Sequence, residues 1–310
     1  MRSSSRSPAH HAVADRPADD FRCGLIAIVG RPNVGKSTLV NRLVGARVTI
    51  TSRKAQTTRH RVSGIVSARD AQFVLVDTPG FQTKHRSRLN DRMNKTVSQS
   101  IADVDVAIVV VEAGRTTEAD RAVIQLLPKR TPAIVAQNKV DRLKDRDLLL
   151  PQMAELAGIR PFAAIVPLSA ETGAGLDALL AEGRLLLPVG AALFDAEAIT
   201  DRDERFLASE FVREKIFRLL GEEVPYATTV AIERFAQEGD LRRIHATIYV
   251  DRDNQRAILL GAGGAQMKAI ASAARTDMER MFGGRVFLEV QVRVKRGWAD
   301  DEALLTRFGY

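Results

Sequence analysis

One loop near the start of the chain constrains its fold more than any other feature. An apolar, β-branched run at residues 25–29 leads directly into this loop, and a helical pattern follows it. In that order of strand, loop and helix, backbone N–H groups at the helix N-terminus can converge on phosphate groups. We expect the phosphates to be held by Gly30, Arg31, Pro32, Asn33, Val34, Gly35, Lys36, Ser37 and Thr38.

Two side chains of this loop have distinct expected roles. Lys36 can reach the β- and γ-phosphate oxygens of a nucleoside triphosphate, which makes it a candidate catalytic residue. The Ser37 hydroxyl can bind the accompanying Mg²⁺. The pattern therefore predicts a nucleotide site with a metal ion beside the phosphates.

A second motif follows the next apolar run, at residues 73–76. Its residues are Asp77, Thr78, Pro79 and Gly80. At the end of a strand, the Asp77 carboxylate can hold Mg²⁺ through a water molecule, and Gly80 can approach the γ-phosphate as a catalytic residue. Alone, such a tetrapeptide is equally typical of a simple aspartate-proline turn. Its place after the phosphate loop favours a nucleotide-dependent switch.

A third motif predicts which base is bound. Asn138, Lys139 and Asp141 follow a predicted strand at residues 133–137. The Asp141 carboxylate can accept hydrogen bonds from guanine N1–H and the 2-amino group, a pair that adenine lacks. Asn138 can brace the loop, and the Lys139 stem can lie over the ring. Further along, Ser169 and Ala170 follow another strand, where the Ala170 N–H can donate to guanine O6.

The polar, basic stretch at residues 53–61 lies between the first two motifs and is typical of a first switch loop. We expect Thr58 to give Mg²⁺ its second hydroxyl and to act in catalysis. The alternative is that Thr57 is the ligand and that Thr58 faces solvent. His60, which lies among arginines, is expected to be solvated.

The alternation of apolar runs and helical patterns divides the chain. Between residues 24 and 187 it predicts an α/β fold, a mainly parallel sheet with helices on both faces. After residue 203 the pattern changes to a long helix, two strands, two helices around a glycine turn, and a last strand. We expect a disordered tail at 1–21, a nucleotide-binding domain at 22–188, a linker at 189–203 and an α+β domain at 204–310.

The glycine turn of the second domain is a candidate RNA site. A tight turn between two helices, ahead of a strand, is the layout of a KH domain, in which bare backbone clamps single-stranded nucleic acid. The alternative is a plain connection between helices. Nine basic residues against four acidic ones between 252 and 296 favour an RNA face. The expected RNA contacts are Gly261, Ala262, Gly263, Gly264, Lys268, Arg275 and Lys295, whereas Trp298 is expected in the core.

The charge and composition of the chain indicate which classes of partner it can bind. A net charge of +8 and a pI near 9.9 favour a polyanion, either nucleic acid or an acidic membrane surface. The longest apolar run, at residues 106–111, is far shorter than the roughly 20 residues of a membrane-spanning helix. The single cysteine, Cys23, permits no internal disulfide and is expected to be buried.

Taken in order, these motifs resemble those of the Era family of bacterial ribosome-assembly GTPases. The likeness covers residues 22–310, from Gln56-Thr57-Thr58-Arg59 and Asp77-Thr78-Pro79-Gly80-Phe81 to the segment at 294–302. It implies a P-loop GTPase domain with bound GTP or GDP and Mg²⁺, followed by a KH domain of type II. Phe81 stands where Ras-like GTPases carry a water-positioning glutamine, which implies slow intrinsic hydrolysis. Asn33 is the implied ligand for a K⁺ ion.

The resemblance also implies partners. It implies binding of 16S ribosomal RNA near its 3′ end, a role in assembly of the 30S ribosomal subunit, and no DNA partner. The implied location is the cytoplasm, with peripheral contact to the inner membrane as an open question. Two alternatives remain: a membrane-associated cell-cycle GTPase, and an RNA-binding scaffold whose nucleotide only stabilises the fold.

Overall fold

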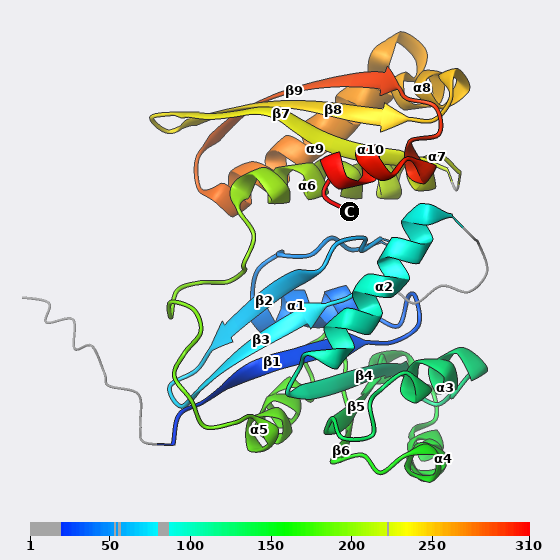
Figure 1. The fold of residues 1–310 in the computed structure, drawn as a ribbon, viewed down its shortest axis with the longest axis vertical. Helices are drawn as coiled ribbons and strands as arrows, with labels where there is room; N and C mark the ends of the chain where they lie inside the picture. Colours follow the sequence, from blue (N-terminus) through cyan, green and yellow to red (C-terminus); the bar gives the residue numbers. More distant parts are fainter. Residues whose placement is uncertain (1–19, 53, 55–56, 80–86, 222) are drawn as a thin grey trace, which may run out of the picture.

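The computed structural model describes residues 20–52, 54, 57–79, 87–221 and 223–310. It contains two sheets, each with its own helices, stacked along the long axis of the molecule (Figure 1). Helix α6 (Glu204–Leu219) lies on the side of the upper unit that faces the lower one, and α2 (Arg88–Ala102) reaches from the lower unit toward it (Figure 1). This arrangement matters for function because segments of both units meet beside the phosphate loop.

The lower unit is built on a six-stranded sheet of order β2-β3-β1-β4-β5-β6. All neighbours pair in parallel except β2, which runs antiparallel to β3. The predicted mainly parallel sheet is therefore confirmed. The strands are β1 (Arg22–Val29), β2 (Val62–Ser67), β3 (Ala71–Asp77), β4 (Val106–Glu112), β5 (Ala133–Asn138) and β6 (Ala164–Pro167).

Helices cover both faces of this sheet, and the apolar residues of the strands are buried between them. On one face α1 (Lys36–Val44) and α5 (Leu176–Leu186) enclose one core. On the other, α2 (Arg88–Ala102), α3 (Glu118–Gln125) and α4 (Leu149–Ile159) enclose a second. Burial of both faces explains why the strands are nearly continuous apolar runs.

The upper unit contains a three-stranded sheet, with β7 antiparallel to β8 and β8 parallel to β9. Its apolar core lies between the sheet and α6, α8 and α9. The elements are α6 (Glu204–Leu219), α7 (Glu223–Tyr226), β7 (Thr228–Glu238), β8 (Leu241–Val250), α8 (Asp253–Leu260), α9 (Ala265–Phe282), β9 (Arg285–Val294) and α10 (Glu302–Arg307). Short 3₁₀ turns lie at Val140–Arg142, Arg146–Leu148, Ala262–Gly264 and Trp298–Asp300.

The connection between the units is fastened to the lower sheet. The Gln72 carboxamide oxygen accepts from the backbone N–H groups of Leu193 and Phe194, at 2.8 and 2.9 Å. The Asp201 carboxylate accepts from both the backbone N–H and the hydroxyl of Ser63, at 2.9 and 3.0 Å. The segment expected as a linker therefore follows a fixed path along β3 and β2.

Two predictions about single residues are confirmed. Trp298 is fully buried and donates from its indole N–H to Ala227 O at 3.0 Å, so it is a core residue. It packs with Leu89 and Met93 of α2 across the two units. Cys23 is buried as a free thiol.

No helix in the described ranges has, on its own, the length and apolar character to cross a membrane. Helices α8 and α9 meet such a test only as a pair, and they are bent by 49° relative to each other.

Candidate functional site

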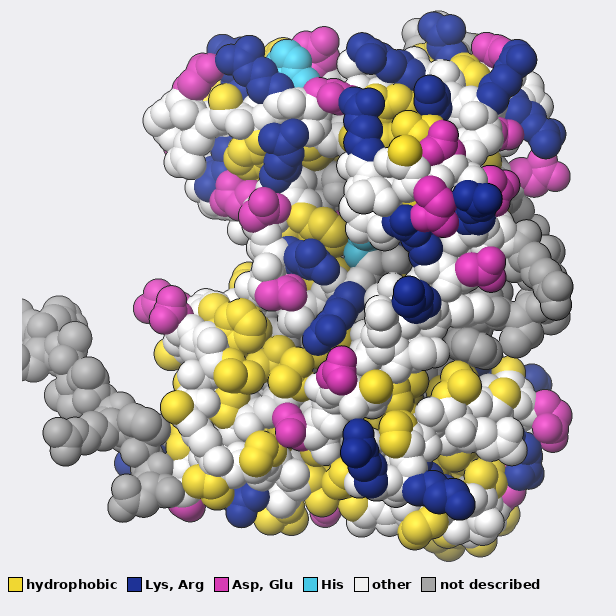
Figure 2. Space-filling view, in the orientation of Figure 1, with side chains coloured by type: hydrophobic (Ala, Val, Ile, Leu, Met, Phe, Trp, Pro, Cys, Tyr) yellow, Lys and Arg dark blue, Asp and Glu magenta, His cyan; other side chains and the backbone are white. Residues whose placement is uncertain are grey.

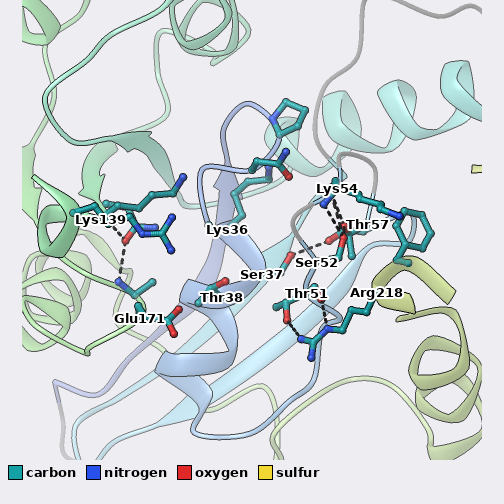
Figure 3. A pocket seen from close by; sticks show the side chains of 18 of the residues that line it. Lys36, Ser37, Thr38, Thr51, Ser52, Lys54, Thr57, Lys139, Glu171 and Arg218 are labelled. Atoms are coloured by element: carbon teal, nitrogen blue, oxygen red, sulfur yellow. Dashed lines mark hydrogen bonds between the residues drawn. The ribbon is translucent and has the colours of Figure 1, made fainter. Parts of the chain in front are cut away.

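A pocket of about 1160 Å³ lies at the carboxyl edge of the six-stranded sheet. The loops after β1, β5 and β6 contribute to its lining, as an open α/β sheet is expected to arrange them. Figure 3 shows the phosphate loop and Lys36 in the middle, Lys139 and Glu171 on one side, and Lys54, Thr57 and Arg218 on the other. The predicted residues in the lining are Pro32, Asn33, Gly35, Lys36, Ser37, Thr38, Thr58, Asn138, Lys139, Asp141 and Ala170.

The two glycines of the phosphate loop are required by close contacts. A Cβ atom on Gly30 would lie 2.5 Å from Val110 O, and one on Gly35 would lie 2.4 Å from Asn138 Nδ2. Gly35 is also left-handed, with φ 102°, and no side chain caps the helix α1 that follows. The first N–H groups of α1 therefore have no partner within the helix and can bind an anion.

Lys36 lies folded over this loop. Its ammonium group donates to Gly30 O at 2.9 Å and to Arg31 O at 3.1 Å. Burial lowers the pKa of Lys36 to about 8. A buried cation is costly unless an anion accompanies it, so this residue is arranged to gain from a phosphate beside it.

Three oxygen-bearing side chains converge next to Lys36. Ser37 Oγ lies 2.8 Å from Asp77 Oδ2 and 2.9 Å from Thr58 Oγ1, and Thr58 Oγ1 lies 3.3 Å from Asp77 Oδ2. The second carboxylate oxygen, Asp77 Oδ1, is buried without a hydrogen-bond partner. Burial raises the pKa of Asp77 to about 6, so the carboxylate is ionised at neutral pH.

This group of hard oxygens fits Mg²⁺, which prefers such ligands and usually keeps several of its waters. Within the described residues, no group of three or more His, Cys, Asp or Glu is placed to hold a metal instead. Thr57 Oγ1 bonds to Ser52 Oγ at 2.7 Å and to Lys54 O at 2.8 Å. The geometry therefore favours Thr58 over Thr57 as the hydroxyl nearest to Asp77.

On the base side of the pocket, Asn138 ties three loops together. Its amide nitrogen donates to Val34 O at 2.8 Å, and its oxygen accepts from the N–H groups of Lys139 and Ala170, at 2.8 and 2.9 Å. The predicted bond from Ala170 to guanine O6 therefore requires that this hydrogen bond be shared or released. Asp141 lines the pocket, where its carboxylate lies 3.8 Å from the Arg142 guanidinium.

Several predicted residues support the pocket from behind. Arg31 points its guanidinium at Glu112 and Asp120, at 2.8 and 3.2 Å, so only its backbone belongs to the phosphate loop. Thr78 and Ser169 are fully buried, and the Thr78 hydroxyl donates to a β1 carbonyl. Pro79 is the last described residue of its motif, and Gly80 and Phe81 lie outside the described residues.

Comparison with known proteins agrees with this geometry. Residues 25–139 match the family described as 50S ribosome-binding GTPase, and residues 223–299 match the KH domain family. The GTPase Era of Nitrosomonas eutropha is 53% identical over 293 residues, which cover 94% of this chain and 99% of that protein. The GTPase Era of Chromobacterium violaceum is 51% identical over 289 residues, covering 93% and 98%. This chain belongs to the Era family of GTPases.

Solved structures of Era proteins share the whole architecture. Aquifex aeolicus Era, in a variant bound to GDP and AlF₄⁻, superposes with a TM-score of 0.90 at 37% identity, covering 94% of this chain and 99% of that one. A structure of Era with MgGDPNP and nucleotides 1506–1542 of 16S ribosomal RNA gives the same values. As an Era GTPase, this chain binds and hydrolyses GTP and carries a KH domain.

The glycine turn of the KH domain in this Era family member is open, and its backbone conformation favours glycine. Gly261, Gly263 and Gly264 have φ values of 68°, 56° and 79°, which glycine adopts most readily. No side chain caps α9, and Ala262 and Gly263 are exposed. Such a turn allows phosphates to approach the backbone.

The basic residues expected to bind RNA are spread over the KH domain. Lys268 is exposed in the first turn of α9, next to the glycine turn. Arg275 lies two turns further along α9 and bonds to Glu279 at 2.7 Å, while Lys295 follows β9. On the face drawn in Figure 2, Lys and Arg side chains gather over the upper unit, interspersed with acidic ones.

One expectation is wrong, and two residues of the pocket were not predicted. His60 is not solvated: its ring stacks on Tyr310 at 4.5 Å, its Nδ1 lies 3.1 Å from Gly309 O, and burial lowers its pKa to about 4. In addition, Phe217 and Arg218 line the nucleotide pocket, although they lie on α6 of the upper unit. No local motif marks them, because only the packing of the two units brings them there.

Proposed function

We propose that this protein is a GTP-dependent switch that binds 16S ribosomal RNA near its 3′ end and assists assembly of the 30S ribosomal subunit. The observation that carries the proposal is the pairing, in one chain, of the nucleotide pocket with an open KH glycine turn. It is supported by the likeness to the Era structure that contains MgGDPNP and nucleotides 1506–1542 of 16S ribosomal RNA. GTP or GDP and Mg²⁺ are the implied ligands, and no DNA partner is proposed.

The proposed roles follow the geometry of the pocket. The phosphate loop and the α1 N-terminus hold the phosphates, Lys36 neutralises their charge, and Asp141 reads guanine. Ser37 and Thr58 would hold Mg²⁺ directly and Asp77 would hold it through water, and the ion would supply charge neutralisation at the phosphates. Lys36, Thr58 and Gly80 are the proposed catalytic residues. With Phe81 in place of a glutamine, intrinsic hydrolysis should be slow.

The RNA role rests on the second unit. We place the GTPase domain at 22–188, the connection at 189–203 and the RNA-binding domain at 204–310, with Gly261–Gly264, Lys268, Arg275 and Lys295 as RNA contacts. Crosslinking of bound RNA in cells, followed by sequencing, tests the target. Reads concentrated at the 3′ end of 16S ribosomal RNA support it, and reads spread evenly over cellular RNA contradict it.

Membrane contact is the competing use of the basic surface. We propose a cytoplasmic protein whose main polyanionic partner is RNA. Flotation with vesicles of anionic lipid, in competition with single-stranded RNA, separates the two. Displacement of the protein from vesicles by RNA supports the proposal, whereas vesicle binding that RNA does not reduce favours a peripheral membrane GTPase.

Base specificity is expected to reside in Asp141. In Asp141→Asn the amide complements the altered edge of xanthine, so the affinity for GTP should fall and that for xanthosine triphosphate should rise. The effect should be about tenfold or more, because a hydrogen bond to a charged group contributes roughly 1.5–3 kcal/mol. Titration calorimetry with both nucleotides measures it, with exposed Asp147→Asn as the matched control. Unchanged GTP affinity in Asp141→Asn would refute the assignment.

A potassium ligand is expected at Asn33. This residue lines the pocket and has a left-handed backbone, with φ 65°. GTP hydrolysis should be faster in K⁺ than in Na⁺, and both Asn33→Ala and Asn33→Gly should abolish the difference. The glycine variant is needed because alanine at a left-handed position costs about 1–2 kcal/mol by itself. Equal rates of GTP hydrolysis by the wild-type protein in the two salts would show that K⁺ is not a ligand of this site.

A further inference from the structure

The KH domain grips the switch segment that leads to Thr58. The Glu214 carboxylate accepts from Thr51 N at 3.0 Å, and the Arg218 guanidinium donates to Thr51 O at 3.1 Å and to its hydroxyl at 2.8 Å. Both residues lie on α6, and Figure 3 shows Arg218 reaching Thr51 at the edge of the pocket. Lys54 donates to the carbonyls of Leu220 and Gly221 at the end of the same helix.

Arg59 makes three further hydrogen bonds to the KH domain. Its guanidinium donates to three backbone carbonyls of the KH domain, Thr228 O at 2.7 Å, Tyr226 O at 3.0 Å and Pro225 O at 3.1 Å. Arg59 is only 2% exposed, and its guanidinium lies 5.6 Å from the centre of the Phe217 ring, which lines the nucleotide pocket. The planar guanidinium group can donate hydrogen bonds to several carbonyls at once in a fixed geometry, which the single ammonium group of lysine cannot do.

Arg59 directly follows Thr58, and the two side chains contact different units of the protein. Thr58 directs its hydroxyl to Ser37 and Asp77 in the GTPase domain, while Arg59 is buried among KH carbonyls. We propose that Arg59 is a positioning residue that holds Thr58 in place for Mg²⁺ and so couples the KH domain to the GTP-bound state. The proposal rests on the proposed role of Thr58 as a metal ligand.

The coupling depends on the short covalent link between Thr58 and Arg59. One peptide unit joins Thr58 to Arg59, so displacement of the three carbonyls must move the hydroxyl that faces Asp77. Switch loops of GTPases are ordered by contacts to the γ-phosphate and Mg²⁺ and released after hydrolysis. Coupling of this kind is reciprocal, so a change at the 225–228 segment should alter affinity for GTP and GTP should alter the KH domain.

The test compares affinities for a GTP analogue and for GDP, both with Mg²⁺, in the full chain. Arg59→Ala and Arg59→Lys should each weaken binding of the analogue by about fivefold or more and leave GDP affinity within about twofold. Thr58→Ala should do the same. In the double variant, Thr58→Ala with Arg59→Ala, the second change should add nothing, because both remove one interaction.

The matched control is Arg47→Ala, which also removes contacts between the units. Arg47 binds Glu214 and Asp277 of the KH domain but lies well before Thr58 in the chain. It should change both affinities equally or not at all. The proposal is overturned if Arg47→Ala weakens binding of the analogue and spares GDP binding, as Arg59→Ala is expected to do. It is also overturned if the losses of affinity caused by Thr58→Ala and Arg59→Ala add fully in the double variant.

The outcomes also separate this inference from the role of Thr58. If Thr58→Ala leaves discrimination between the analogue and GDP intact, the metal-ligand assignment fails. If Thr58→Ala abolishes discrimination and a folded Arg59→Lys retains it, only the positioning role of Arg59 fails. Thermal unfolding of each variant shows that it is folded before affinities are compared.

Discussion

Lys36→Ala is expected to lower the affinity for GTP by roughly several hundredfold to several thousandfold. The ammonium group is buried in the phosphate loop, and removal of one partner from a buried charge pair costs about 3–5 kcal/mol. Its present hydrogen bonds, to Gly30 O and Arg31 O, hold it within the loop that the phosphates enter. Titration calorimetry with GTP measures the loss.

The control for this variant is Lys129→Ala, which removes an exposed lysine elsewhere in the GTPase domain. It should bind GTP as the wild-type protein does. Single-stranded RNA should still bind to Lys36→Ala in the absence of nucleotide if the KH domain remains folded. Normal GTP affinity in Lys36→Ala would mean that the phosphates bind elsewhere.

Replacement of Ala262 and Gly263 by aspartate is expected to lower the affinity for single-stranded RNA at least tenfold. Two carboxylates would then stand where phosphates approach the α9 N-terminus, and each contact between like charges costs about 1–4 kcal/mol. The turn has room for them, since a Cβ on Gly263 meets no atom within 4 Å and Ala262 is exposed. Fluorescence anisotropy with labelled RNA measures the effect, and GTP affinity should not change.

Asparagine at the same two positions is the matched control. It has nearly the same shape as aspartate, tolerates the left-handed backbone of Gly263 and carries no charge. The asparagine variant should therefore keep much more RNA affinity than the aspartate variant. Wild-type RNA binding should also weaken with salt, with a log-log slope of about −0.7 per neutralised phosphate. Equal loss in both variants would indicate distortion of the turn and not repulsion of phosphates.

The parts of the site that the sequence predicts are those encoded in contiguous segments. The phosphate loop, Asp77 and Asn138 each follow an apolar strand, and the parallel sheet brings their carboxyl ends to one edge. Thr58 was predicted from its place in a polar loop, and its hydroxyl indeed lies beside Asp77. The motifs determine these positions because each is short and attached to a buried strand.

The parts that escaped prediction depend on contacts between distant segments. Strand β2 is an edge strand interrupted by Gly64, so its apolar pattern is weak. His60 was expected in solvent, but Tyr310 covers it from the far end of the chain. Phe217 and Arg218 reach the nucleotide pocket from a helix whose own sequence pattern indicates only a core element of the KH domain.

The most direct test of the account is the affinity of the full chain for RNA with the sequence of the 16S ribosomal RNA 3′ end. It should be measured with Mg²⁺ and either a GTP analogue or GDP, because we propose that the nucleotide state controls the KH domain. Affinity should be about fivefold or more higher with the analogue, the range expected of coupled sites. Equal affinity in the two states, or no preference over RNA of scrambled sequence, would contradict it.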